Sequence, residues 1–252
     1  MDDSRNKMIK MLEAMESTEK WNKLTRAKNE LFRKKLDIDA AEKFSEHVLQ
    51  RLVDTCNDKY IFGSFYNWEL KSVADKISIT DKIVKVFIRN IKDDILQNRI
   101  QLYNRNGSKY NYTNDTIDTA FKEDIINSIP NLEIQDRNAP DAMMGVSRNG
   151  TLYINYQHPF YQKSALFFLM DLKHELTHFI DIFIPSISII DPEINMNAQM
   201  FYVNPQHDLQ LYDENPLEIN ANTKRKDCRI KLTQMLKNQE STILASNINN
   251  TK

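Results

Sequence analysis

The sequence predicts an α+β protein that is mainly helical and carries a small antiparallel sheet. Apolar residues repeat at helical spacing over much of residues 1–97. Short alternating runs surround two Asn-Gly pairs between residues 100 and 156. The most apolar stretch, residues 164–184, has the length of a helix and is apolar on nearly all sides between Ala165 and Met170. We therefore expect it to form a central buried helix.

Length and composition are typical of a globular protein with a substantial core. The chain has 252 residues, of which 41% are hydrophobic and 27% charged, and its formal net charge is -1. A nearly neutral chain has no overall field that would recruit nucleic acid, so no nucleic-acid partner is expected. The 4 glycines disfavour a glycine-rich nucleotide site. We expect no membrane span, because charged residues interrupt the long apolar run.

The chain is expected to form one large domain, or one domain with a helical extension. A soft boundary near Ser78 would separate a helical N-terminal region, 1–78, from a second region, 79–245, and the two can also pack as one unit. Cys56 and Cys228 lack the spacing of a disulfide framework or a zinc knuckle, which favours reduced thiols in a cytoplasmic protein. The residues after Met1 do not resemble a Sec-type signal peptide.

The first third of the chain is predicted to be helical. Residues 1–36 are charged and nearly free of turn formers, with apolar residues at helical spacings, and they predict one or two amphipathic helices. An apolar stripe predicts another helix at about 39–57. Residues 80–97 combine strand-forming Ile and Val with a helical period. Because the period is the stronger signal, we predict a helix with Thr80 as its N-cap.

The middle of the chain is predicted to form two hairpins and a short helix. The first hairpin joins residues 100–103 and 109–112 across Asn106-Gly107, and the helix covers about 118–129 and ends before Pro130. The second hairpin joins 144–147 and 151–156 across Asn149-Gly150. Residues 151–156 alternate between apolar and polar, as expected of a half-buried strand.

The last third is predicted to hold two helices separated by a loop. The first follows His158-Pro159, contains the apolar stretch and ends at Pro185. Residues 186–212 lack strong periodicity and predict a loop or a short irregular segment. The second helix begins at Asn215-Pro216, with Asn as N-cap and Pro at the first helical position, and continues through a basic run towards Lys237.

The apolar helix carries the motif His-Glu-x-x-His at residues 174–178. Residues four apart on a helix lie on one face, so His174 and His178 can converge on one metal ion. Glu175 points about a quarter turn away, where it can hold a water without being a ligand. The alternative is a pair of polar residues on an exposed helix face, but the apolar surroundings favour a metal, since burying such groups unpaired costs several kcal/mol.

A catalytic zinc site needs a third protein ligand. The metzincin pattern would place a glycine and a histidine where this chain has Asp181 and Ile184, so that class is excluded. The downstream candidates are His207, Asp213, Glu214 and Glu218. Glu218 also has a structural interpretation, because it is three residues after Asn215, where a Glu can complete a capping box.

At residues 151–226 the chain resembles the gluzincin branch of zinc metallopeptidases, in which a Glu from a second helix completes a His-His-Glu site. The resemblance is carried by the His-Glu-Leu-Thr-His motif and by Asn215-Pro216-Leu217-Glu218-Ile219-Asn220-Ala221, which is similar to the N-P-x-E-x-x-A helix start of several bacterial families. It implies a zincin-like domain around a central HExxH helix, and Zn²⁺ held by His174, His178 and Glu218. It further implies that Glu175 is the general base.

The resemblance also suggests roles for neighbouring residues. A Tyr or His donates to the developing oxyanion in related enzymes, and the candidates are Tyr212, Tyr202 and His207, of which we favour Tyr212. Many gluzincins carry an Asp one turn after the ligand Glu, where this chain has Asn222. Asp181 lies on the face of His178 and can support it, or it can be a solvated carboxylate at the helix end. Residues 151–156 are placed as the edge strand that pairs with substrate in zincins.

The predicted function is that of a zinc-dependent endopeptidase acting on a protein or peptide substrate. The alternative is a catalytically retired zincin fold that serves as a binding or sensor module, against which an intact Glu175 argues. In its predicted architecture, a single zincin-like domain with a helical N-terminal region, the chain is similar to the effector metallopeptidases that bacterial pathogens deliver into host cells by a dedicated secretion system. Substrate identity, the role of the N-terminal helices and oligomeric state stay open.

Overall fold

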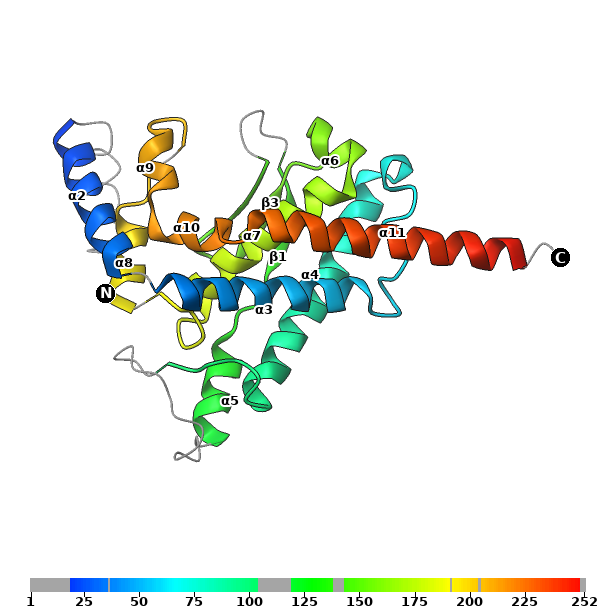
Figure 1. Ribbon diagram of the computed structural model, residues 1–252, viewed down its shortest axis with the longest axis horizontal. Helices are drawn as coiled ribbons and strands as arrows, with labels where there is room; N and C mark the ends of the chain where they lie inside the picture. Colours follow the sequence, from blue (N-terminus) through cyan, green and yellow to red (C-terminus); the bar gives the residue numbers. More distant parts are fainter. Residues whose placement is uncertain are drawn as a thin grey trace.

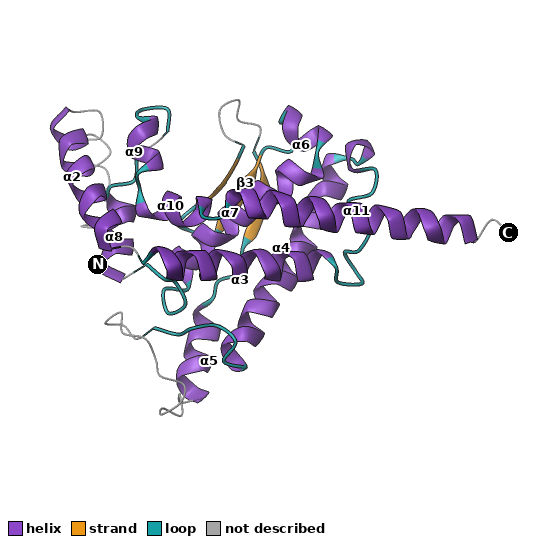
Figure 2. Ribbon diagram, in the orientation of Figure 1, coloured by secondary structure: helices purple, strands orange, loops and turns teal. Residues whose placement is uncertain are grey.

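A computed structural model describes residues 19–35, 37–103, 119–137, 143–190, 192–203 and 205–249. Within these ranges the chain is mainly helical with a three-stranded sheet (Figure 2), which confirms the α+β class. Helix α7, Ala165–Phe183, lies at the centre (Figure 1) and packs against helices α3, α6, α10 and α11 and against strand β2. The predicted central buried helix is therefore confirmed.

The segment after His158-Pro159 forms two helices rather than one. Helix α6, Pro159–Lys163, begins with His158 as N-cap and ends where Ser164 adopts an extended conformation. Ser164 then caps α7, because its hydroxyl accepts a hydrogen bond from the backbone N–H of Phe167. Helix α7 ends before Pro185, as the sequence predicts.

The N-terminal part of the described chain is helical, as predicted. Its elements are α2 (Glu19–Lys35), α3 (Ile38–Cys56), the 3-10 helix η1 (Trp68–Leu70) and α4 (Val73–Leu96). Helix α4 begins seven residues before Thr80, so the predicted N-cap is wrong. Ser72 caps the helix in a capping box with Asp75. Thr80 is instead buried inside the helix, where its hydroxyl donates to the Lys76 carbonyl and accepts from Tyr156.

The sheet is mixed, not antiparallel as predicted. Its strands are β1 (Glu133–Asp136), β2 (Met144–Val146) and β3 (Thr151–Ile154), in the order β1-β3-β2. The hairpin across Asn149-Gly150 is confirmed, with Gly150 at φ +82°, but β1 pairs in parallel with the other side of β3. The expected edge strand is therefore the central strand, and β2 is the edge nearer α7.

Two further predictions concern the neighbourhood of the sheet. Helix α5, Thr119–Ser128, confirms the short helix before Pro130. The hairpin across Asn106-Gly107 lies largely outside the described residues. Of its predicted first strand, Tyr103 donates its backbone N–H to the carbonyl of Ser186.

The segment between α7 and α10 is more regular than predicted. It contains α8, Pro192–Met200, and α9, Leu209–Asp213, so the prediction of a loop is wrong. Helix α10, Pro216–Asn222, begins as predicted with Asn215 as N-cap and Pro216 in its first turn. It stops at Thr223, and α11, Arg225–Asn249, begins after Lys224 at φ 56°. The single predicted helix is thus two helices with a break.

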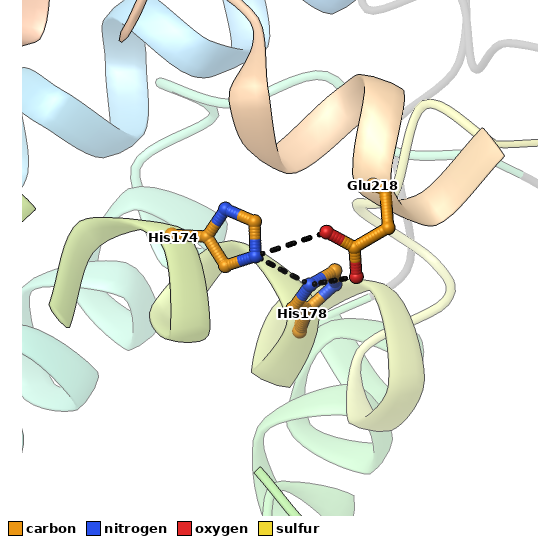
Figure 3. Close-up of side chains that lie close together, drawn as sticks. All are labelled: His174, His178 and Glu218. Atoms are coloured by element: carbon orange, nitrogen blue, oxygen red, sulfur yellow. Dashed lines mark hydrogen bonds and ion pairs between the residues drawn. The ribbon is translucent and has the colours of Figure 1, made fainter. Parts of the chain in front are cut away.

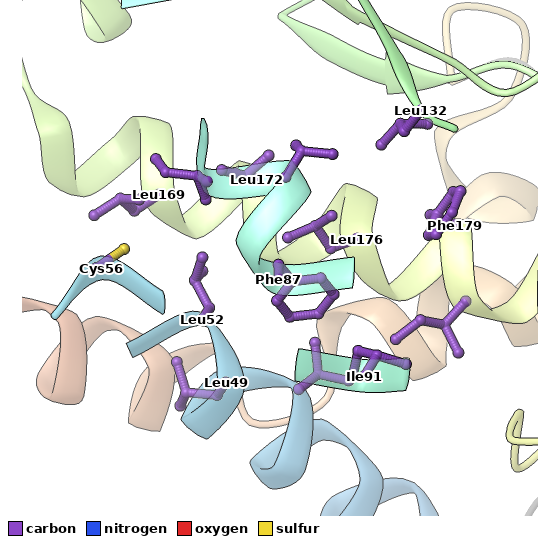
Figure 4. Packing of buried hydrophobic residues seen from close by; sticks show 14 of the residues in the cluster. Leu49, Leu52, Cys56, Phe87, Ile91, Leu132, Leu169, Leu172, Leu176 and Phe179 are labelled. Atoms are coloured by element: carbon purple, nitrogen blue, oxygen red, sulfur yellow. The ribbon is translucent and has the colours of Figure 1, made fainter. Parts of the chain in front are cut away.

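The main core is shared by helices from both ends of the chain. Figure 4 shows Leu52 of α3, Phe87 of α4 and Leu172 and Leu176 of α7 packed together. Each is fully buried, and truncation of such a leucine to alanine typically costs about 2–5 kcal/mol. Ser78 lies within α4, whose buried residues belong to this same core. The domain boundary proposed there stays a prediction.

A second, smaller cluster of buried apolar residues attaches α2 to α8 and α10. Phe32 of α2 packs with Ile194 and Ala198 of α8 and with Leu217 of α10. Asn29 of α2 also donates to the carbonyl of Leu211 in α9. Helix α2 therefore contacts α10, the helix that carries Glu218. No helix among the described residues is long and apolar enough to cross a membrane.

Candidate metal centre

His174 and His178 lie one turn apart on α7, and their imidazoles meet the carboxylate of Glu218 from α10 (Figure 3). The two Nε2 atoms are 2.9 Å apart. Nε2 of His174 lies 3.2 Å from Oε2 of Glu218, and Nε2 of His178 lies 3.0 Å from Oε1. The structure thus brings together three of the residues that the sequence singles out.

These distances fit a shared metal ion. Ligand atoms about 2.0–2.1 Å from a tetrahedral zinc ion lie about 3.3 Å from one another, close to the separations between these three side chains. Two imidazole nitrogens and one carboxylate oxygen are also donors that divalent transition metals accept. Among the described residues, no donor is in hydrogen-bond geometry with the buried Oε2 of Glu218. The group can therefore hold a metal ion.

The negative charge of Glu218 and the positive charges of the histidines stabilise one another. Burial alone would raise the pKa of Glu218, but its contacts with the imidazoles of His174 and His178, and the charges of these groups, lower the pKa well below its usual range. Burial would likewise lower the pKa of His178, but the hydrogen bond and charge of Glu218 raise it. The carboxylate is therefore ionised, as a metal ligand must be.

The start of α10 fixes the position of Glu218. The Asn215 side chain accepts from the backbone N–H of Leu217 and donates to the carbonyl of Ala198. The backbone N–H of Asn215 donates to the backbone carbonyl of Tyr212 and not to the carboxylate of Glu218. The capping-box interpretation of Glu218 is therefore wrong. Glu218 is 0% exposed and points towards α7.

Asp181 connects α7 to α10 from inside the protein. Its Oδ2 accepts from the side-chain amide of Asn220 at 2.8 Å, and its Oδ1 accepts from the hydroxyl of Ser188 at 2.6 Å. Burial raises the pKa of Asp181 to about 6, although both hydrogen bonds lower it. Asp181 is thus not a solvated carboxylate. Asn222, the residue at the position of the family's Asp, accepts from Arg225 instead.

A buried lysine adds a second connection. Lys173, the residue before His174, donates through Nζ to the hydroxyl of Ser45 in α3 and to the carbonyl of Ala221 in α10. Burial lowers the pKa of Lys173 to about 8. Neither Lys173 nor Asn220 is singled out by the sequence as part of the site. The only local signal for Lys173 is a charged residue within an otherwise apolar helix.

Glu175 is held against the sheet, beside the cluster of ligands. Its Oε2 accepts from the backbone N–H of Val146 at 2.9 Å, so strand β2 orients the carboxylate. Burial raises the pKa of Glu175, against the lowering effect of the charges of His178 and His174. A buried carboxylate with a raised pKa is suited to accept and return a proton near neutral pH. Sequence reasoning did not identify Val146.

Of the three oxyanion candidates, the two tyrosines lie at the site and the histidine does not. Tyr202 donates to Oε1 of Glu218 at 2.5 Å, and its ring stands edge-on to that of Tyr212, with centroids 5.7 Å apart. Burial and the charge of Glu218 raise the pKa of both phenols, so both keep their protons. His207 and Asp213 are exposed, and among the described residues neither belongs to a group of side chains that could hold a metal ion.

A cleft of about 840 Å³ opens onto these groups. Strand β2 forms one wall, and the segments around α8 and α9 form the other. Its lining includes Glu175, His178, Tyr202 and Tyr212, together with apolar residues such as Met144. The cleft is therefore bordered by Glu175, His178 and both tyrosines.

Comparison with known proteins assigns no family. No family model, curated protein or solved structure matches the chain. Any function must therefore be inferred from the residues of the site.

Proposed function

We propose that this protein is a zinc-dependent endopeptidase that hydrolyses peptide bonds in a protein substrate. The observation that carries the proposal is the convergence of His174, His178 and Glu218 beside a buried Glu175 that lines the cleft. A cluster of ligands alone would suit a structural metal. An additional carboxylate that is not a ligand, oriented by a strand edge, is what a hydrolytic zinc site of the zincin type needs.

The donor set favours zinc in a catalytic role. Two histidines and one glutamate are the ligands of several catalytic zinc sites, and three protein ligands leave one position open. When bound, zinc supplies a Lewis acid that lowers the pKa of water towards ~7 and polarises carbonyl oxygens. Tyr202, Lys173 and the Asp181–Asn220 pair keep the three ligands in place.

The other residues of the cleft complete the reaction. Glu175 accepts the proton of the attacking water and returns it to the leaving amine, and the Val146 N–H keeps its carboxylate in position. Tyr212 lines the cleft with a protonated hydroxyl, so it is placed to donate to the oxyanion that develops on the scissile carbonyl. Tyr202 donates to Glu218 at 2.5 Å, whereas Tyr212 contacts Glu218 and Tyr202 less closely, so Tyr212 is the donor that we favour.

Two substitutions separate the ligands from the base. Glu175→Gln should keep stoichiometric zinc, measured by elemental analysis, and lose proteolysis. Glu218→Ala should lose zinc, because it removes one of three ligands. Wild-type rates of cleavage by the Glu175→Gln protein would refute the assigned base. Retention of zinc by Glu218→Ala would refute the ligand set.

A comparison of the proteins cleaved in cells by the wild type and by Glu175→Gln provides the substrate test. We expect fragments that depend on Glu175. If both proteins bind zinc and neither produces fragments, the endopeptidase proposal fails and a binding or sensor module takes its place.

A further inference from the structure

The cleft beside β2 is lined by positively charged side chains, except where Glu175 lies. Two arginines, Arg137 and Arg148, line it, and Glu175 is the one carboxylate among the described residues of its lining. The remaining lining residues are apolar or neutral apart from His178. Because the whole chain has a formal net charge of -1, this concentration of positive charge is local and not a consequence of composition.

The two arginines line the cleft towards opposite ends of the sheet: Arg148 follows β2, and Arg137 follows β1, which β3 separates from β2. Arg137 directly follows β1, and its backbone N–H donates to Ile154, the residue that pairs with Met144 at the start of β2. Arg148 lies in the turn that follows the end of β2 at Val146. Because both residues line the cleft, a chain bound along β2 would have Arg148 past its Val146 end and Arg137 on the cleft wall towards its Met144 end.

Both guanidiniums retain donors for a ligand. Arg137 is exposed and lies over the ring of Tyr153, 5.5 Å from its centroid. Arg148 is exposed and uses Nη2 to reach the carbonyl of Gln199. Within the described ranges neither forms an ion pair with a carboxylate. A guanidinium has five N–H donors and prefers a carboxylate partner, so one neutral contact does not satisfy it.

The position of Glu175 relates these charges to the reaction. Its contact with the N–H of Val146 places the reactive centre beside the last residue of β2. A strand rises about 3.3 Å per residue, so Arg148 lies about two residues along from that point and the start of β2 lies about two residues in the other direction. Arg137 is separated from β2 by β3, about 4.8 Å per strand, so it reaches the cleft through its long side chain, which is part of the cleft lining.

We propose that the cleft selects protein segments that carry Asp or Glu on both sides of the scissile bond, about two residues from it on the Arg148 side. Arg137 and Arg148 are then the residues that determine specificity. This inference rests on the proposed endopeptidase function, and it adds the class of substrate that the site accepts.

The first test measures binding and needs no turnover. Zinc-loaded Glu175→Gln protein is titrated with fluorescent peptides that carry an apolar centre flanked by Glu, by Gln or by Lys. We expect the Glu peptides to bind about fivefold or more tightly than the Gln peptides, with the difference falling as salt is added. The Lys peptides should bind weakest.

Charge reversal provides the matched variants. Arg137→Glu combined with Arg148→Glu should reverse the order, so that Lys peptides bind tightest. Arg229→Glu, an exposed substitution on α11 outside the cleft lining, should leave the order unchanged. Equal binding of Glu and Gln peptides, or a preference that survives the double substitution, would overturn the inference.

The second test separates this inference from the proposed function. Zinc-loaded wild type digests a randomised peptide library, and mass spectrometry records the residues around each cut. Acidic enrichment on both sides is expected. Cleavage without that enrichment overturns the specificity and leaves the endopeptidase in place. Arginine-dependent binding of Glu peptides without any cleavage refutes the endopeptidase and keeps the acidic selectivity of the cleft.

Discussion

The substitution Tyr202→Phe tests whether the zinc ligands are held in place by their surroundings. The Tyr202 hydroxyl donates to Oε1 of Glu218 at 2.5 Å, and that oxygen also lies 3.0 Å from Nε2 of His178. Phenylalanine keeps the ring and its packing against Tyr212 but removes the donor. We expect the substituted protein to bind zinc more weakly while it remains folded.

The size of the effect follows from the charge and burial of Glu218. A hydrogen bond to a charged group contributes about 1.5–3 kcal/mol. Since about 1.4 kcal/mol corresponds to a tenfold change in affinity, zinc should bind about 10–100-fold more weakly. Loss of other partners that orient metal ligands has effects of the same size. Glu218 is 0% exposed, so water cannot readily replace the lost donor.

The assay is competition for zinc against a chromophoric chelator, with Tyr212→Phe as the matched control. Tyr212 lines the cleft beside Tyr202 and contacts Glu218 less closely than Tyr202 does, so its loss should lower turnover and weaken zinc binding less than the loss of Tyr202. Thermal unfolding of the metal-free proteins shows whether either substitution disturbs the fold. Unchanged zinc affinity in Tyr202→Phe, or an equal loss in both variants, would refute the assigned division of roles.

Three predictions concern stability. Burial of Asp94 opposes its ionisation, but hydrogen bonds from His47 and Arg51 lower its pKa in the folded protein. The ionised Asp94 therefore contributes to folding stability above its unfolded pKa near 3.8, and this contribution is lost as the pH falls through the lower folded pKa. Asp94→Asn should therefore unfold more easily at neutral pH, by about 3–5 kcal/mol, because it breaks a buried ion pair. Acid titration followed by circular dichroism should show a smaller loss of stability below pH ~4 than in the wild type. Ser72→Ala removes the cap of α4 and should cost about 1 kcal/mol in urea unfolding, whereas no change would contradict the capping box. Gly150→Ala should cost about 1 kcal/mol because Gly150 lies at φ +82°, and equal midpoints would show that the turn relaxes.

The three candidate ligands were predictable because their positions depend on local periodicity and on a helix start. His174 and His178 are four apart on a helix that composition already marked as buried. Asn215 and Pro216 together specify a helix start, which places Glu218 in the first turn of α10. That Glu218 faces α7 and does not cap its own helix depends on tertiary packing.

The errors lie where long-range pairing decides the structure. Residues 151–156 are expected at the sheet edge because zincins place an edge strand before the motif helix. The parallel partner β1, which makes β3 the central strand, contributes only four residues without a turn signal. Helices α8 and α9 have 9 and 5 residues, too few for a clear period. They are stabilised by contacts with α2, more than 150 positions away in the chain.

Asn220, not Asn222, supports the site, and this difference from the prediction also depends on tertiary packing. Asn222 follows Glu218 by four residues and so was expected on the same face, but α10 ends there and its side chain accepts from Arg225. Asn220 points to the other side, where it donates to the buried Asp181 of α7. Because neutral donors hold Asp181, this connection between α7 and α10 does not depend on a metal. The two helices that supply the ligands are thus fixed to each other by the protein itself, which lowers the ordering cost when a metal binds.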